Sequence, residues 1–301
     1  ISTCQRMRRP RNKVTVVGNS KTNDRVVMRE IRTKPGQLFS RSDIIRTQRE
    51  LAQLGYFDQE KLGVNPKPNP ADGTVDIEYT VEEKASDQLE LSGGYGANQL
   101  VGTLGLSFNN FSARNIFKGS AWSPLPSGDG QRLSLRAQSN GKFFQSYNAS
   151  FTEPWLGGKK PNSLSVSAYQ SIQTNGRPKG DALRSEIKIS GVSVGLGKRL
   201  RKPDDFFTLY QEVNFQHYSL NNYTGSFVYS TGSSKNLSFT EMISRNSVDA
   251  PIYPRTGSNN SLSLEFTPPW SIFNFRNIDY KTASINEKYN WIEYYKIKYT
   301  S

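Results

Sequence analysis

Cysteine and histidine are almost absent from this sequence of 301 residues, which contains one of each, Cys4 and His217. A single cysteine excludes an internal disulfide and a metal site built from cysteines. His217 falls in a predicted strand, and no serine and aspartate pattern accompanies it, so we interpret it as a side chain at the rim or in the interior of a β-structure. We therefore expect no enzymatic activity, no metal and no cofactor.

Long hydrophobic runs are missing as well. No stretch approaches the ~20 consecutive apolar residues that a transmembrane helix requires. Residues 1–10 are polar and basic, without the apolar region of a signal peptide, and the first residue is not methionine. We expect the sequence to be a segment of a longer protein.

Acidic residues are scarce: 26 Asp and Glu stand against 39 Lys and Arg, which gives a net charge of +13. Such an excess is common in proteins that bind nucleic acid or an anionic surface. Here the basic residues are spread along the chain, and no nucleic-acid recognition motif is present. We expect no nucleic-acid partner, because charges that face a polar interior or lipopolysaccharide explain the excess equally well.

The first part of the chain predicts one small α+β domain. The elements, in order, are a strand over 13–17, a helix that begins at Asn23 or Asp24, a helix that begins at Ser40 or Ser42 and ends at Gly55, and strands over 60–65 and 74–82. This β-α-α-β-β order suits two helices on a three-stranded sheet. We place the domain at residues 12–85, after the end of a preceding segment at 1–11.

Beyond this domain the pattern changes to short segments that alternate apolar and polar residues, as in 104–108 and 262–266. A period of two places one set of side chains on each face of a sheet, so one face is apolar and the other polar. Alternation alone fits an antiparallel sandwich with one solvent-exposed face as well as it fits a membrane β-barrel.

Three features favour the barrel over residues 86–301. The segments are long enough to cross a membrane, for which tilted strands need ~9–11 residues. Connections alternate between short and long, as barrel turns and outer loops do. Aromatic residues gather at segment ends, at Phe143, Phe144, Trp155, Phe206, Phe207 and Trp270. We predict about ten strands, the last around 291–299, and further strands or another chain to pair with that open edge.

The Gly93-Gly94-Tyr95-Gly96 segment superficially suggests a phosphate-binding loop. No helix follows it, so helix-terminus anion binding is excluded. The glycines instead fall in a predicted first barrel strand, Leu89 to Ala97. Glycine inside a strand weakens pairing and allows close approach of another backbone. The alternative is that these glycines only relieve crowding at a bend.

Several motifs resemble known families. Segments 16–22 (Val-Val-Gly-Asn-Ser-Lys-Thr) and 51–57 (Leu-Ala-Gln-Leu-Gly-Tyr-Phe) resemble a POTRA domain, the polypeptide-transport-associated repeat. Segment 151–156 (Phe-Thr-Glu-Pro-Trp-Leu) resembles an early-barrel motif, and 249–258 resembles the motif before the ninth strand. As a whole the chain resembles the BamA-type family of outer-membrane β-barrel assembly factors. It departs from them in lacking upstream POTRA repeats and the later barrel, and in a longer loop at 120–130.

This resemblance implies a POTRA domain in the periplasm followed by an incomplete antiparallel transmembrane β-barrel in a bacterial outer membrane. It also implies a function, the folding and insertion of outer-membrane proteins by strand templating at a lateral seam. The templating edge is expected at Leu89, Glu90, Leu91, Ser92, Gly93, Gly94, Tyr95 and Gly96. Expected partners are nascent outer-membrane proteins, accessory lipoproteins, and outer-membrane lipid and lipopolysaccharide.

A second edge is expected in the POTRA-like domain, where a nascent chain or partner lipoprotein binds, although this domain could serve only as a spacer. Its residues are Glu60, Lys61, Leu62, Gly63, Val64 and Asn65. Structural roles are expected for Pro154, Trp155, Pro254 and Gly257, at strand ends and turns. Alternative functions are a two-partner secretion translocator that passes its substrate through the lumen, and a passive porin or soluble binding module.

Overall fold

A computed structural model of the chain describes residues 11–96, 99–122, 125–225, 227–248, 255–273, 278–279 and 281–301. The chain divides into two compact units. Ile1–Gln88 and Phe108–Arg132 form the first unit, and Leu89–Ser107 and Leu133–Ser301 form the second.

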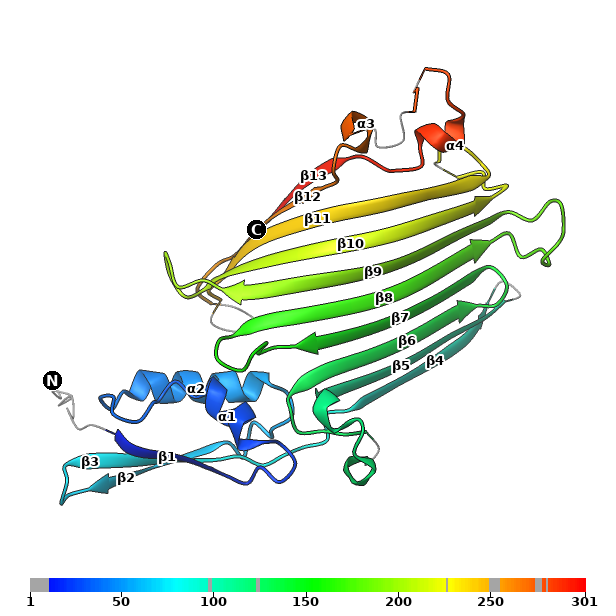
Figure 1. Ribbon diagram of the computed structural model, residues 1–301. Helices are drawn as coiled ribbons and strands as arrows, with labels where there is room; N and C mark the ends of the chain where they lie inside the picture. The colour runs from blue at the N-terminus through cyan, green and yellow to red at the C-terminus, as the bar shows by residue number, and fades with distance from the viewer. Residues whose placement is uncertain are drawn as a thin grey trace. The chain divides into compact units, whose positions relative to one another are not determined.

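The first unit contains the predicted β-α-α-β-β domain. Its elements are β1 (Arg11–Val17), α1 (Asp24–Glu30), α2 (Arg41–Gln53), β2 (Gly63–Asn69) and β3 (Thr74–Thr80). The strand order is β1-β3-β2, with β1 parallel and β2 antiparallel to the central strand (Figure 1). The predicted fold of this domain is therefore confirmed.

Local sequence explains where the helices begin and end. The side chain of Ser40 accepts a hydrogen bond from the Asp43 backbone N–H at 3.3 Å, so Ser40 is the cap of α2. Gly55, with a φ of +85°, follows this helix in the left-handed conformation that glycine adopts without strain. The helices and the sheet enclose an apolar core in which Val26, Val27 and Phe57 are fully buried.

Strand β2 begins later than the sequence predicted. Glu60 and Lys61 lie in a turn, where the Asp58 carboxylate accepts a hydrogen bond from the Glu60 backbone N–H at 3.0 Å, and Leu62 lies between this turn and the strand. The segment from Pro66 onward, which suggested a turn, continues the strand to its end at residue 69. Proline is tolerated in β2 because it is an edge strand.

The second unit contains most of a ten-stranded sheet, as predicted, in which the strands follow one another in chain order. Figure 1 shows them side by side from β4 to β13. Its strands are β4 (Gln88–Gly96), β5 (Gln99–Phe111), β6 (Gln131–Asn140), β7 (Phe144–Glu153), β8 (Asn162–Thr174), β9 (Glu186–Arg199), β10 (Phe207–Asn221), β11 (Gly232–Asn246), β12 (Asn259–Phe266) and β13 (Tyr295–Thr300).

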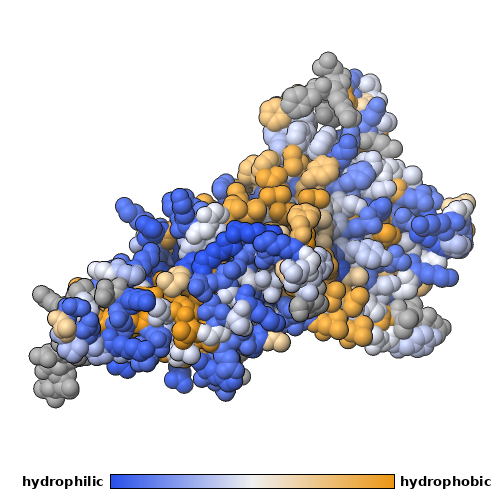
Figure 2. Space-filling model, turned by 60° about the horizontal axis from the view of Figure 1, so that its bottom comes forward, coloured by the Kyte–Doolittle hydropathy of each residue, from blue (hydrophilic) through white to orange (hydrophobic). Residues whose placement is uncertain are grey.

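The two faces of this sheet differ in polarity, as the alternation predicted. Val194 of β9 lies opposite Val166 of β8 and Val213 of β10, and its side chain is 44% exposed. On the other face, the hydroxyls of Ser167 and Ser193 hydrogen-bond at 2.8 Å. Figure 2 shows hydrophobic side chains exposed at the surface instead of covered. This arrangement suits a membrane barrel, which is apolar outside and polar inside.

Some boundaries and connections differ from the prediction. Ala97, predicted to end the first strand, lies outside the described residues. The last strand begins at Tyr295, while Trp291 forms an isolated bridge with Lys235. Connections do not alternate strictly between short and long, since three successive connections, 141–143, 154–161 and 175–185, become longer one after another. Among the described residues, no helix has the length and apolar character needed to cross a membrane.

Candidate strand-templating edge

Strand β4, which contains all the residues of the predicted templating edge, lies at one edge of the ten-stranded sheet. Within the described part of the chain, β5 is the only strand that pairs with it. The N–H and C=O groups on the other side of an edge strand remain available to another strand. In the described part of the barrel, the backbone groups of β4 that face away from β5 form the row with which a further strand would pair.

Successive side chains of β4 point to opposite faces of the sheet. Leu89 and Leu91 are 68% and 79% exposed, and Tyr95 is 75% exposed. On the polar face, the Glu90 carboxylate pairs with the Arg136 guanidinium of β6 at 3.1 Å. The edge thus has apolar side chains outward and an ion pair inward.

Gly105 of β5 leaves the space for this ion pair. A Cβ atom at Gly105 would lie 3.1 Å from the Glu90 Oε2 atom. Glu90 can therefore reach across β5 to Arg136. The pair therefore places charge on the polar face of the sheet beside β4.

The glycines of β4 are not required by lack of space. A Cβ atom at Gly94 would meet no atom within 4 Å, and one at Gly93 would lie 3.8 Å from the Val101 carbonyl oxygen, an ordinary contact. The structure therefore gives no support to relief of crowding at these two positions. Their remaining physical effect is to weaken the strand by removing side-chain contacts and increasing backbone freedom.

The second predicted edge is only partly in a strand. Gly63, Val64 and Asn65 lie in β2, which is an edge of the three-stranded sheet. Two prolines, Pro66 and Pro68, follow in the same strand and have no backbone N–H to donate. The edge of β2 is therefore a poorer template than that of β4.

The predicted structural positions lie at strand ends. The Glu153 carboxylate accepts a hydrogen bond from the Trp155 backbone N–H at 2.9 Å, just after β7, and Pro154 lies in the same turn. Gly257 has a φ of +101°, and a Cβ atom there would lie 2.3 Å from the Ser247 carbonyl oxygen. Only glycine fits this turn. Pro254 lies outside the described residues.

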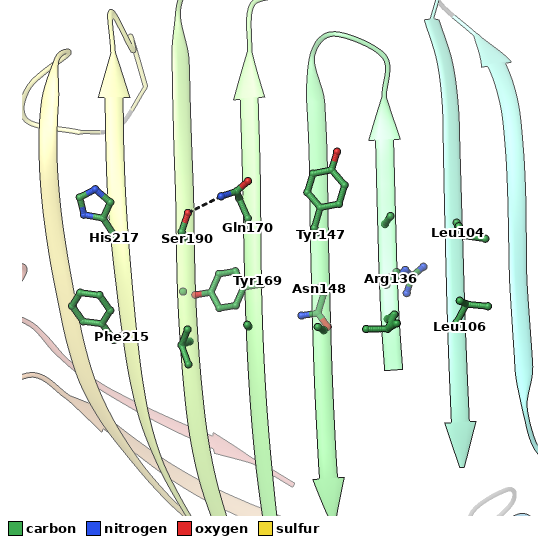
Figure 3. A pocket seen from close by; sticks show the side chains of 16 residues that line it. Leu104, Leu106, Arg136, Tyr147, Asn148, Tyr169, Gln170, Ser190, Phe215 and His217 are labelled. Carbon is green, nitrogen blue, oxygen red and sulfur yellow. Dashed lines mark hydrogen bonds between the residues drawn. The ribbon is translucent and has the colours of Figure 1, made fainter. Parts of the chain in front are cut away.

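An apolar groove of about 780 Å³ crosses the outer face of β5 to β10, and Figure 3 shows its lining. His217 and Phe215 of β10 both line it, near Val192 of β9. The histidine therefore lies on the outer face within β10 and not in the interior, which was one of the two predicted positions. The groove is on the face expected to contact acyl chains and does not include β4.

The sequence did not predict a polar junction in the first unit, between the start of α1 and the β5–β6 connection. The Asn23 backbone and side chain both donate to the Gly128 carbonyl oxygen at 2.9 Å. The Asn23 side chain also donates to Asp129 at 2.8 Å, and Asn110 donates to the Thr22 hydroxyl at 2.8 Å. We call this set the polar junction: Thr22, Asn23, Arg25, Asn110, Ser112 and Asp129.

Asp129 is the charged centre of the polar junction and is only 4% exposed. It accepts a hydrogen bond from the Ser112 hydroxyl at 2.7 Å and pairs with Arg25. Burial raises the pKa of Asp129, but the hydrogen bonds from Ser112 and Arg25 and the charges of Arg25 and Arg114 outweigh it and hold the pKa below its ordinary value. The only sequence signal was the turn-forming segment 127–130 (Ser-Gly-Asp-Gly).

An α+β domain of the POTRA type that leads into an antiparallel sheet with one apolar and one polar face defines a class of outer-membrane β-barrel proteins. Comparison with known families agrees. The family described as POTRA, surface antigen variable number repeat, matches residues 11–84, and the Omp85 superfamily domain matches residues 127–300. The chain therefore belongs to the Omp85 superfamily, as a BamA-type member with a POTRA domain and a β-barrel. It is an outer-membrane protein whose POTRA domain is in the periplasm.

Individual relatives agree with this assignment. The outer membrane protein assembly factor BamA of Neisseria meningitidis serogroup B is 25% identical over 296 residues, which covers 92% of this chain and 33% of that protein. BamA of Nitratidesulfovibrio vulgaris is 30% identical over 193 residues, covering 63% of this chain and 22% of that protein. The chain thus spans a third or less of the length of these curated relatives.

Solved structures share the fold. BamA from Haemophilus ducreyi lacking POTRA domains 1–3 matches with a TM-score of 0.58 and 21% identity, covering 87% of this chain and 49% of that one. CdiB from Escherichia coli matches with a TM-score of 0.53 and 16% identity, covering 88% of this chain and 46% of that one. The fold is therefore similar to both proteins, and the barrel is partial in this chain.

Proposed function

We propose that this chain is part of the central subunit of an outer-membrane β-barrel assembly machinery. In this role it folds and inserts outer-membrane proteins without enzymatic chemistry. The observation that carries the proposal is the weak first strand of the barrel: β4 has glycines at positions 93 and 94, where a Cβ atom would meet no close contact. The BamA relatives support the general role in outer-membrane protein assembly.

The proposed mechanism is β-augmentation at β4. When the lateral seam beside β4 opens, a nascent strand pairs with the backbone groups of β4 that face away from β5, so the affinity comes from main-chain hydrogen bonds that any strand can form. Exposed Leu89 and Leu91 place apolar contacts on the lipid side, while Glu90 and Arg136 restrict the other face to polar side chains. Strand pairing and burial of apolar side chains in lipid supply the driving force, so no nucleotide is needed.

The proposed partners are nascent outer-membrane proteins, accessory lipoproteins of the assembly complex, and lipid and lipopolysaccharide of the outer membrane. In the POTRA domain, the first residues of β2, Gly63 to Asn65, are the part of the edge that precedes the prolines. A lipoprotein or nascent chain that pairs there would find few N–H donors beyond Asn65. We therefore propose a short contact at this edge.

Cysteine crosslinking tests the templating edge. Single cysteines at Leu89, Leu91 and Gly93, in a background without other cysteines, are exposed to an outer-membrane β-barrel substrate stalled during insertion. Substrate adducts are expected at these positions and not at Arg136, which faces the polar interior, or at Val194, which faces lipid in the middle of the sheet. Equal labelling at Arg136 and Leu91 would overturn templating at the edge.

The second candidate is a secretion translocator that passes its substrate through the lumen. The likeness to CdiB, at TM-scores of 0.51 and 0.53, concerns the fold alone, and it agrees with either function. A translocated chain would contact the polar interior, so adducts at Arg136 without adducts at Leu91 would favour this candidate.

A further inference from the structure

The β5–β6 connection, residues 112–130, lies at the periplasmic ends of its two strands. β4 leaves the POTRA domain and so begins on the periplasmic side, and the antiparallel β5 ends on that same side. At this level a connection of a membrane barrel meets the lipid headgroups of the periplasmic leaflet. The described residues of this connection belong to the same compact unit as the POTRA domain.

Large apolar side chains project from this connection into solvent. Phe117 is 96% exposed, Trp122 is 49% exposed, and Ile116 is 36% exposed. The Trp122 indole N–H donates to the Ile116 carbonyl oxygen at 2.9 Å, which holds the two ends of the exposed segment together. Two short 3-10 helices, η1 (Ala113–Asn115) and η2 (Gly119–Ala121), flank Phe117. The backbone of this segment is thus hydrogen-bonded although its apolar side chains are uncovered.

A basic pocket of about 600 Å³ adjoins this segment. Its cationic side chains are Lys21, Arg25, Arg114 and Lys118. Arg25 is paired with Asp129, whereas the side chains of Lys21, Arg114 and Lys118 form no ion pair with any residue that the structure describes. The pocket therefore holds more positive charge than its own carboxylates neutralise.

The polar junction fixes the two walls of this pocket to each other. Asp129 in the connection binds Asn23 and Arg25 in the POTRA domain, and all three line the pocket. A Cβ atom at Gly128 would lie 2.5 Å from the Lys21 carbonyl oxygen, so the backbones of the two walls are in direct contact. The cations of both walls are held around one space before any ligand binds.

We propose that this connection is an interfacial anchor that inserts Phe117 and Trp122 into the periplasmic leaflet and binds the phosphate of an anionic phospholipid in the basic pocket. Aromatic side chains are stable at the membrane interface, and Lys and Arg beside them attract anionic headgroups. The apolar segment and the uncompensated cations adjoin each other, which is the combination that amphipathic membrane anchors present. The inference uses the outer-membrane location and does not depend on strand templating.

Photocrosslinking in nanodiscs tests the anchor. A photoreactive phenylalanine analogue replaces Phe117 in the intact protein, in nanodiscs that contain radiolabelled phosphatidylglycerol or phosphatidylcholine in equal amounts. Phosphatidylglycerol adducts are expected to predominate. The double substitution Lys21→Gln and Lys118→Gln, which leaves Arg114 beside Asp129, is expected to reduce that preference about fivefold for each charge removed.

Two controls use the opposite end of the strands. The analogue at Leu183, which is 65% exposed in the connection between β8 and β9, should give a lipid ratio that the double substitution does not change. The matched pair Arg177→Gln and Lys179→Gln should leave the ratio at position 117 unchanged.

Three outcomes would overturn the anchor. These are the absence of lipid adducts at position 117, adducts there to an acidic protein in place of lipid, and a phosphatidylglycerol preference that survives loss of both charges. The cysteine crosslinks at β4 are measured separately, so failure of the anchor and failure of strand templating are distinguishable.

Discussion

The POTRA domain and the ten-stranded sheet use the same apolar residues in opposite ways. Val27 and Phe57 are fully buried in the POTRA core, whereas Val194 and Phe215 on the sheet are 44% and 41% exposed. In water, folding removes apolar side chains from the solvent. In a bilayer the solvent is itself apolar, so the barrel places such side chains outside and satisfies its polar groups within the sheet. The exposed fraction of the apolar side chains therefore indicates whether water or lipid surrounds each region.

The edges of the two sheets differ as well. β2 contains Pro66 and Pro68, which cannot donate backbone hydrogen bonds. β4 contains Gly93 and Gly94, which retain their N–H groups and add no side chain. Proline blunts an edge against pairing, whereas glycine only weakens the strand. The two edges thus differ in how readily they accept another strand.

The largest expected effect tests the difference between the buried core of the POTRA domain and the lipid-facing surface of the sheet. Phe57→Ala should destabilise the POTRA domain by about 3–5 kcal/mol, because it leaves a cavity in a closed core. Phe215→Ala should have a smaller effect, since acyl chains can fill the space beside a lipid-facing side chain. Urea unfolding of the intact protein, followed by hydrogen exchange in each unit, measures both. Equal losses would contradict the contrast between the two regions.

The next effect tests the two faces of the sheet. Val194→Arg should cost about 2–4 kcal/mol, because it places a charge on the lipid-facing side in the middle of β9. The neighbouring substitution Ser193→Arg is the matched control and should cost much less, since Ser193 faces the polar interior, where it contacts Ser167. Folding into vesicles as a function of urea measures the difference. A costlier change at Ser193 would reverse the assignment of the faces.

A smaller effect is expected at the polar junction, which contrasts with the dry core of the POTRA domain. Asp129→Asn should weaken the junction by about 1–3 kcal/mol, because a buried charged acceptor is lost while Arg25 remains partly solvated. Hydrogen exchange of the Asn23 backbone N–H, which donates to Gly128, reports the loss.

The pKa of Asp129 gives this effect its pH dependence. Because the pKa is lowered in the folded protein, the stabilisation is complete above the ordinary value of ~4 and is lost as the pH falls through the folded-state value. The difference between wild type and Asp129→Asn should therefore disappear in acid. A difference that grows as the pH falls would show that the charge of Asp129 is not the cause.

Local patterns predicted most of the fold, and long-range contacts were the part they missed. Helix caps such as Ser40 and the alternation around Val194 depend on neighbouring residues, so they can be recognised in the sequence. The start of β2 was misplaced because a turn held by Asp58 competed with strand propensity. The polar junction joins Thr22 to Asn110, which are 88 residues apart, and no local pattern specifies such a pair.

The candidate site was predictable in position but not in its details. The glycine-containing segment indicated a first strand, and the family resemblance indicated its use as an edge. The reach of Glu90 across Gly105 to Arg136 depends on strand register, which alternation alone does not fix. The exposure of the Phe117 side chain could not be predicted either, because the sequence of a loop does not determine which of its side chains are buried.

The smallest expected effect compares the two edges directly. Gly94→Ala adds a methyl group where no atom lies within 4 Å, and Gly63→Ala adds one in β2 at an ordinary contact distance of 3.5 Å from the Thr80 Cβ atom. Each should stabilise its strand by about 0.5–1 kcal/mol, because alanine has less backbone freedom than glycine in the unfolded chain. If a weak β4 is what admits a substrate strand, only Gly94→Ala should lower the yield of substrate adducts at Leu91, since it stiffens the templating edge while Gly63→Ala stiffens a strand in the other unit. An equal loss of adducts in both variants would mean that overall stability, and not the weakness of this edge, controls insertion.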